Sequence, residues 1–193
     1  MKYYKKRFKK FGLDPRALAW KDRSAAVTRY RQLVKDLSFE GKSILDIGCG
    51  FGWIIDNISQ KTRNFDYTGC DITKELIKEA KKIYPSHKFL VYDYFANPPG
   101  KKYDIVLASG VLNGRKYDNL GFRKVAISTM FANASEALVF NMAGGHPQPK
   151  NKTTSQVYYV DSLKILKYCL GMSRKIIFRG HYHSKDFTIV MFK

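Results

Sequence analysis

Short apolar runs alternate along the chain with longer stretches in which apolar residues recur every three or four positions. Runs bounded by turn residues predict buried strands, and the longer stretches predict helices. The expected strands are residues 43–47, 66–71, 88–93, 103–109, 137–142, 174–179 and 186–192. The expected helices are residues 15–37, 73–83, 122–134 and 161–170, with a further helix around Ile54, Ile55 and Ile58. Strands that alternate with helices predict an α/β fold with a mostly parallel sheet covered on both faces.

Capping and turn residues mark the ends of several of these elements. Asp14 before Pro15 is typical of a helix start, and Thr73 is a second expected N-cap. Gly171 follows the helix of residues 161–170 and stops it. The connector of residues 180–185 is too short for a helical crossover, so the last two strands are expected to be antiparallel.

The length and composition predict one globular domain, residues 1–193, because 45% of the 193 residues are hydrophobic. No apolar run approaches the roughly 20 residues that span a bilayer, and the first residues lack the apolar region of a secretory signal. Cys49, Cys70 and Cys169 are odd in number and form no CxxC pair, so neither a disulfide framework nor a zinc site is expected. These features predict a cytoplasmic protein.

The net charge of +19 is unusual and predicts attraction to polyanions. The expected partners are RNA or an anionic small molecule, and the alternative is that the lysines are merely solvated. Residues 2–11 contain six basic and four aromatic side chains. Such a mixture either holds phosphates and stacks bases or forms a disordered basic tail.

The strongest chemical pattern is the glycine-rich segment that follows the first expected strand, with Gly48, Gly50 and Gly52. A dinucleotide fingerprint would place its third glycine at position 53, where this chain has Trp53. Asp46, two residues before the first glycine, is badly placed for a pyrophosphate and well placed for a cation. S-adenosylmethionine (SAM) carries an ammonium and a sulfonium and no phosphate, so the segment favours SAM over NAD and disfavours a dehydrogenase.

Asp46-x-Gly48-x-Gly50-x-Gly52 resembles motif I of the class I SAM-dependent methyltransferases. The resemblance extends over most of the chain and implies a three-layer Rossmann-like sandwich. Its mostly parallel seven-stranded sheet would contain an antiparallel C-terminal hairpin strand. Residues 41–193 would form this core, and the basic residues 1–40 a helical lid. The implied cofactor is SAM, with S-adenosylhomocysteine (SAH) as its product.

The resemblance also implies roles for residues at the strand ends. Asp71 matches the acid that binds the ribose hydroxyls, and Asp93 the acid that reads the adenine amino group. Ser109 and Gly110 match the segment beside the methionine part of SAM. The complete set implied for the cofactor is Asp46, Gly48, Cys49, Gly50, Asp71, Ile72, Asp93, Tyr94, Ser109 and Gly110.

The acceptor of the methyl group is expected at the ends of the fourth, fifth and sixth strands. His146 is the candidate base there, and Asn113, His181 and His183 are candidate substrate contacts. Trp20 is a candidate contact from the lid, or else packs a helix onto the sheet. His181 and His183 are two residues apart, so both could face the same side of a strand. No third ligand converges with them, so no metal site is expected.

Three functions follow from the pattern. The first is methyl transfer to an unidentified acceptor, expected to be a small anionic molecule. The second is an RNA methyltransferase that uses the basic surface, which predicts RNA affinity that falls steeply with salt. The third is a SAM-binding regulatory protein without catalysis, because the residues alone present no recognisable catalytic base.

Overall fold

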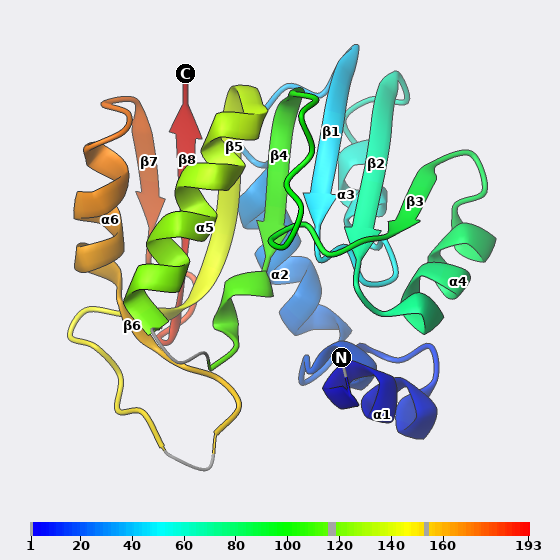
Figure 1. The fold of residues 1–193 in the computed structure, drawn as a ribbon, viewed down its shortest axis with the longest axis horizontal. Helices are drawn as coiled ribbons and strands as arrows, with labels where there is room; N and C mark the ends of the chain where they lie inside the picture. Colours follow the sequence, from blue (N-terminus) through cyan, green and yellow to red (C-terminus); the bar gives the residue numbers. More distant parts are fainter. Residues whose placement is uncertain (1, 116–118, 153–154) are drawn as a thin grey trace. The chain divides into compact units, whose positions relative to one another are not determined.

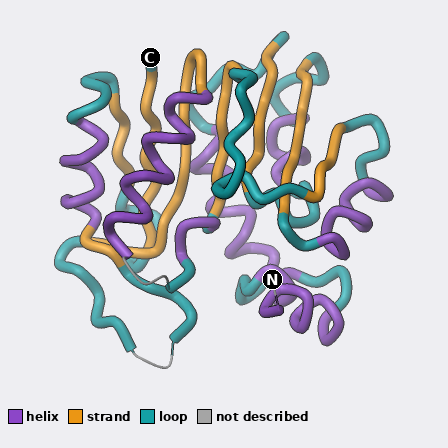
Figure 2. The backbone as a smooth tube through the Cα atoms, in the orientation of Figure 1, coloured by secondary structure: helices purple, strands orange, loops and turns teal. Residues whose placement is uncertain are grey.

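A computed structural model describes residues 2–115, 119–152 and 155–193 of the chain, which forms two compact units. Unit 1 is Met1–Asn97, and unit 2 is Pro98–Lys193. Each unit is an α/β layer structure of its own, and Figures 1 and 2 show helices packed along strands in both. Among the described residues, no helix has the length and apolar character needed to cross a membrane.

Unit 1 contains a three-stranded parallel sheet in the order β3-β2-β1. Its strands are β1 (Lys42–Ile47), β2 (Phe65–Asp71) and β3 (Lys88–Val91). Its helices are α1 (Lys2–Phe11), the 3-10 helix η1 (Pro15–Leu18), α2 (Arg23–Val34), α3 (Ile54–Ser59) and α4 (Lys74–Ile83). Because all three strands run the same way, β1 and β2 end on one edge, where the glycine-rich segment and Asp71 follow.

Unit 2 combines parallel and antiparallel strands in the order β4-β5-β8-β7, with β6 beside β5. Its strands are β4 (Tyr103–Ser109), β5 (Ala134–Gly145), β6 (Val160–Asp161), β7 (Ile176–Arg179) and β8 (Asp186–Phe192). Its helices are the 3-10 helix η2 (Val111–Asn113), α5 (Asn119–Asn133) and α6 (Ser162–Leu170). Strand β5 is parallel to β4 and antiparallel to β8.

The predicted fold class is confirmed. The fold is mixed α/β, its strands are mostly parallel, and the two C-terminal strands β7 and β8 are antiparallel, as their short connector requires. Strands β4 and β8 have the predicted bounds, because their apolar runs are continuous and flanked by turn residues. Strand β6 is absent from the sequence-based prediction, since two residues carry no periodicity.

The predicted helix of residues 15–37 is wrong in its first half. Asp14 caps only the four residues of η1, because its carboxylate accepts from the Arg16 amide and Ala19 then takes a left-handed φ of 63°. A second cap follows at Asp22, whose side chain accepts from the Ala25 amide and starts α2. Before this segment, residues 2–11 form the helix α1 rather than a disordered tail.

Other element ends shift by a few residues. Strand β3 stops at Val91, two residues before the predicted end, and β7 starts two residues later than expected. Thr73 occupies the N-cap of α4 as predicted, but its side chain makes no capping hydrogen bond. The Thr73 amide instead donates to the Asp71 carboxylate, at 2.8 Å.

Candidate functional site

The glycine-rich segment after β1 has a backbone conformation that ordinary residues avoid. Gly48, Gly50 and Gly52 have φ of 70°, 56° and 75°, in the left-handed region. A Cβ atom at Gly50 would lie 2.9 Å from Cδ2 of Leu18, and one at Gly52 would lie 2.9 Å from Cε1 of Phe89. Both the backbone angle and the lack of room therefore require glycine at these two positions.

Strand β2 holds the turn through its last two residues. The Gly48 and Cys49 amides both donate to the Cys70 carbonyl oxygen, at 2.8 and 3.0 Å. The Gly50 amide donates to Oδ2 of Asp71, at 3.2 Å. Burial raises the pKa of the Cys49 thiol well above its ordinary value, which keeps it protonated and unsuited to act as a nucleophile.

Asp71 connects three segments at the carboxyl edge of unit 1. Its carboxylate accepts from the Gly50 amide and from the Thr73 amide, and its backbone oxygen accepts from the Tyr92 amide at 3.0 Å. Burial raises the pKa of the carboxyl, and the amide donors lower it. An ionised carboxylate offers about four acceptor positions, so capacity remains for the two hydroxyls of a ribose.

Asp46 lies on β1 and is 3% exposed. Its Oδ2 accepts from the Tyr67 hydroxyl at 2.7 Å. Burial raises the pKa of Asp46 to about 7; the Tyr67 hydrogen bond opposes this rise, and the nearby charge of Asp71 adds to it. A cation close to this carboxyl would favour its ionised form, so the residue suits an ammonium group better than a phosphate.

The other predicted cofactor residues of unit 1 lie beside Asp71. Ile72 directly follows it and is 40% exposed. Asp93 is exposed, and its Oδ1 accepts from the Ala96 amide at 3.2 Å. Tyr94 is buried. The structure thus brings the turn after β1, the end of β2 and the segment after β3 to one edge of the sheet.

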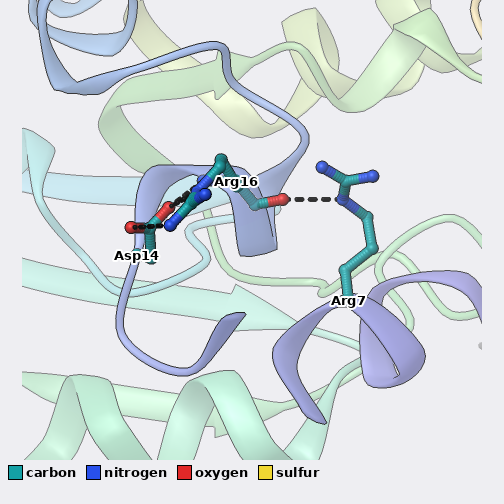
Figure 3. Close-up of polar contacts among 3 residues, drawn as sticks. All are labelled: Arg7, Asp14 and Arg16. Atoms are coloured by element: carbon teal, nitrogen blue, oxygen red, sulfur yellow. Dashed lines mark hydrogen bonds and ion pairs between the residues drawn. The ribbon is translucent and has the colours of Figure 1, made fainter. Parts of the chain in front are cut away.

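The N-terminal segment packs against this edge. Phe8, Phe11, Leu18 and Trp53 contact a buried cluster of Ala17, Phe51 and Leu76. The Arg7 Nε donates to the Arg16 carbonyl oxygen at 2.7 Å, and the Arg16 guanidinium pairs with Asp14 (Figure 3). Helix α1 is therefore fixed to η1, and η1 contacts the glycine turn through Leu18.

Trp20 is half-buried beside α2. The Arg29 guanidinium lies over its ring, 4.8 Å from the centroid, and Arg29 Nη1 donates to the Ala25 carbonyl oxygen. These contacts pack Trp20 against the helix that follows it.

In unit 2, Ser109 and Gly110 are held by an asparagine of the neighbouring strand. Asn141 of β5 is 1% exposed. Its Oδ1 accepts from the Gly110 amide at 2.7 Å, and its Nδ2 donates to Ser109 Oγ at 3.2 Å. Gly110 has φ of 68°. This left-handed conformation, which glycine adopts readily, lets the chain turn from β4 into η2.

Asn113 makes a similar connection at the end of η2. Its Oδ1 accepts from the Ala143 amide at 2.7 Å, and its backbone oxygen accepts from the Tyr158 amide at 2.9 Å. The end of η2, the end of β5 and the segment before β6 are therefore joined at the carboxyl edge of β4 and β5.

His146 directly follows β5, and its Nδ1 lies 3.5 Å from Oδ1 of Asp161. Asp161 is placed there by β6, where it pairs with Gly145, and it also caps α6 by accepting from the Leu163 amide. The His146 side chain is 55% exposed and that of Asp161 is 18% exposed. The pair can orient one imidazole nitrogen and leave the other to face solvent.

His181 and His183 do not lie on a strand, contrary to the expectation that they would share one side of it. Both are exposed in the connector between β7 and β8. His183 Nδ1 accepts from the Lys185 amide at 3.1 Å, two residues on, because the connector folds into a local turn instead of continuing β7.

Sequence reasoning missed Asn141, Asp161 and Leu18. Asn141 is a polar residue inside the buried run of β5, and that interruption is a usable signal. The sequence pattern places Asp161 only within a helix, and its contact with His146 depends on β6, which has no signature in the sequence. The same pattern places Leu18 on one side of a long helix that the structure divides.

Residues 45–126 match a family model described as "Methyltransferase domain". The fold is similar to that of solved SAM-dependent methyltransferases. The DhpI-SAM-HEP complex has a TM-score of 0.73 at 13% identity, and the match covers 98% of this chain and 94% of that one. The N-methyltransferase NodS from Bradyrhizobium japonicum WM9, solved with SAH, has a TM-score of 0.66 at 13% identity, with coverage of 100% and 97%. The matched segment is therefore similar to a methyltransferase domain, and the chain has the fold of the solved SAM-dependent methyltransferases.

Curated relatives carry the same class name. Putative methyltransferase 235L of Invertebrate iridescent virus 6 is 40% identical over 67 residues, which are 35% of this chain and 25% of that protein. Putative methyltransferase Rv1506c of Mycobacterium tuberculosis is 25% identical over 156 residues, 78% of this chain and 93% of that protein. The chain thus spans a quarter of the viral relative and nearly all of the mycobacterial one.

Proposed function

We propose that this chain transfers a methyl group from SAM to a small acceptor that carries a negative charge and a removable proton. The observation that carries the proposal is the turn after β1, where three left-handed glycines lie beside an Asp71 carboxylate bound to the Gly50 amide. Relatives named for O-methylation and for N-methylation both match the chain, so the methylated atom is left open.

The cofactor assignment begins with the edge of unit 1. SAM supplies an electrophilic methyl group on its sulfonium when bound. Asp71 would hold the ribose hydroxyls, Asp93 the adenine amino group, and Asp46 the ammonium group. Ile72 and Tyr94 would line the nucleoside part. The turn through Gly48, Cys49 and Gly50 would lie against the methionine part. Ser109 and Gly110, at the end of β4, are the cofactor candidates that the sequence resemblance implies within unit 2.

We assign the lid to residues 1–40. Helix α1 is tied to η1 by the Arg7–Arg16 bond, and Leu18 of η1 lies against Gly50. A segment in this position would limit access of water to the cofactor. Trp20 is a candidate acceptor contact from this segment.

The acceptor assignment uses unit 2. Oδ1 of Asp161 lies 3.5 Å from Nδ1 of His146 and would orient the ring, which leaves Nε2 to take the proton that the acceptor loses as the methyl group is added. Asn113, His181 and His183 are the further candidate contacts. The preference for an anion rests on the net charge of +19 and on the exposed Arg115, Lys150 and Lys185 of unit 2.

Calorimetric titration with SAH tests the cofactor site. Asp71→Ala removes the acceptor of two amides and of the ribose hydroxyls, so we expect its SAH affinity to fall about 100-fold, which is about 2.7 kcal/mol. Asp66→Ala is the matched control, since Asp66 is an exposed acid on the same strand. Binding of NAD rather than SAH, or equal affinity in the two variants, would contradict the assignment.

Methyl transfer from labelled SAM to a panel of small anionic metabolites tests the acceptor assignment. With the acceptor so found, His146→Gln is expected to lower kcat about 100-fold and to leave SAH affinity unchanged. If nuclease treatment of the enzyme and the extract abolishes turnover, the small-acceptor proposal is wrong and RNA is favoured as the substrate.

A further inference from the structure

Helix α1 carries six basic residues and no acidic one. The lysines recur every three or four residues, so they share one face of the helix. Lys5, Lys6, Lys9 and Lys10 are all exposed. The opposite face is occupied, because Phe8 and Phe11 pack on the cluster of Ala17, Phe51 and Leu76.

Helix α4 has the same construction. Lys74, Lys78, Lys81 and Lys82 follow the same spacing and are all exposed. Leu76, Ile77 and Ala80 form the other face and are buried. Four lysines on one side of a ten-residue helix therefore project away from the core of unit 1.

An ion pair joins the two helices. Nζ of Lys5 in α1 lies 3.0 Å from Oε1 of Glu75 in α4, so the two helices that carry the lysine rows contact each other in unit 1. Glu79 pairs with Lys82 at 2.8 Å. Within the described part of the chain, no carboxylate pairs with Lys6, Lys9, Lys74, Lys78 or Lys81.

We propose that these two rows form a binding surface for the phosphate backbone of single-stranded RNA. The surface is defined as Lys5, Lys6, Lys9, Lys10, Lys74, Lys78, Lys81 and Lys82. Each row lies on a ten-residue helix. A helix of that length extends about 15 Å, so each row can face several successive phosphates.

The apolar side of α1 argues against a membrane as the partner. A helix that lies on a membrane inserts an apolar face between the lipids. In α1 that face is Phe8 and Phe11, and both are already packed against unit 1. Helix α1 also belongs to the lid assigned above, but RNA binding by the lysine rows does not require methyl transfer, so the two proposals are tested separately.

Fluorescence anisotropy with a labelled uridine homopolymer of about 20 nucleotides tests the proposal on the full chain. Each phosphate contact to a single strand adds about 0.7 to the salt slope, so affinity should fall at least tenfold between about 50 and 200 mM salt. The triple variant Lys74→Gln, Lys78→Gln, Lys81→Gln should bind at least tenfold more weakly at about 50 mM salt.

The control removes the same charge from unit 2, through Lys150→Gln, Lys164→Gln and Lys167→Gln, which are also exposed. It should keep most of the RNA affinity. Thermal unfolding followed by circular dichroism checks that both variants fold, and SAH titration separates this surface from the cofactor site. Two results would each overturn the proposal: no RNA binding at low salt, whether or not the chain binds phosphatidylserine vesicles, or equal loss of RNA affinity in both variants.

Discussion

The two units both gather polar groups at the carboxyl ends of their strands, but they shape these ends by different means. In unit 1 the turn after β1 is made by glycines in left-handed conformations, and backbone amides do the bonding. In unit 2 asparagine side chains accept hydrogen bonds from backbone amides of the neighbouring segment, as Asn141 does from Gly110 and Asn113 from Ala143. A left-handed backbone favours glycine, so the three glycines of this turn leave a spaced motif. A hydrogen bond to one asparagine side chain depends on a single residue, so it leaves no spaced motif in the sequence.

One buried charged group from each unit extends the comparison. Unit 1 buries the Asp46 carboxyl, whose pKa is raised to about 7. Unit 2 buries the Arg123 guanidinium, whose pKa burial lowers to about 10. Only the first of these two groups titrates near neutral pH. The stability of unit 1 should therefore respond to pH in that range.

The largest expected effect concerns a glycine of unit 2 that packing requires. A Cβ atom at Gly144 would lie 2.4 Å from the Val160 carbonyl oxygen and 2.9 Å from Cε1 of Phe187. Gly144→Val should force β6 away from β5 and cost about 3 kcal/mol or more in the free energy of unfolding. Urea denaturation measures this cost.

Gly100→Ala is the matched control, because a Cβ atom there meets nothing within 4 Å. It should change stability by no more than about 0.5 kcal/mol. Equal stability of the two variants would mean that β6 tolerates displacement, and the position of Asp161 beside His146 would then lose its structural support.

The next effect is the pH dependence of stability that the buried Asp46 carboxyl should cause. The folded-state pKa of Asp46 lies above its unfolded value, so the folded state holds the extra proton between about pH 4 and pH 7. The stabilisation is complete below the unfolded pKa and is lost as pH rises through the folded pKa. The free energy of unfolding should fall across this window by an amount on the order of a few kcal/mol.

Asp46→Asn should remove that share of the pH dependence, since the amide does not titrate and its oxygen can still accept from Tyr67. Tyr67→Phe should extend the loss to higher pH, because it removes the bond that favours the ionised carboxyl. The measurement is chemical denaturation of the three proteins from about pH 4 to pH 8. Parallel curves for wild type and Asp46→Asn would refute the assignment.

Much of the fold could be predicted because its signals are local. Strand β4 is a continuous apolar run with clear flanks, and the short connector of residues 180–185 permits only an antiparallel pair. The division of residues 15–37 into η1 and α2 could not be predicted from the sequence. Asp14 and Asp22 are equally good N-caps, and the residues between them have helical periodicity. Strand β6 exists only through its pairing with β5.

The candidate site divides in the same way. The turn at Gly48, Gly50 and Gly52 is visible because each residue solves a backbone problem that only glycine solves. The contact of Asp161 with His146 joins residues 15 positions apart through two strands, and no periodicity encodes it. The packing of Leu18 against Gly50 depends in turn on the end of η1 at Ala19, and no residue in the sequence predicts that helix end.

The smallest expected effect tests that last contact. Gly50→Ala places a side chain at φ of 56° and a Cβ atom 2.9 Å from Cδ2 of Leu18. The left-handed conformation alone should cost about 1 kcal/mol, and the contact adds a further cost that a shift of the leucine can relieve. Leu18→Ala should recover that further cost and leave the first. A double-mutant cycle should therefore give a coupling of about 0.5 kcal/mol or more between the two positions. Additive costs would mean that Leu18 moves freely and that η1 does not press on the glycine turn. The lid assignment would then lose the contact on which it depends, while the glycine requirement of unit 1 would remain.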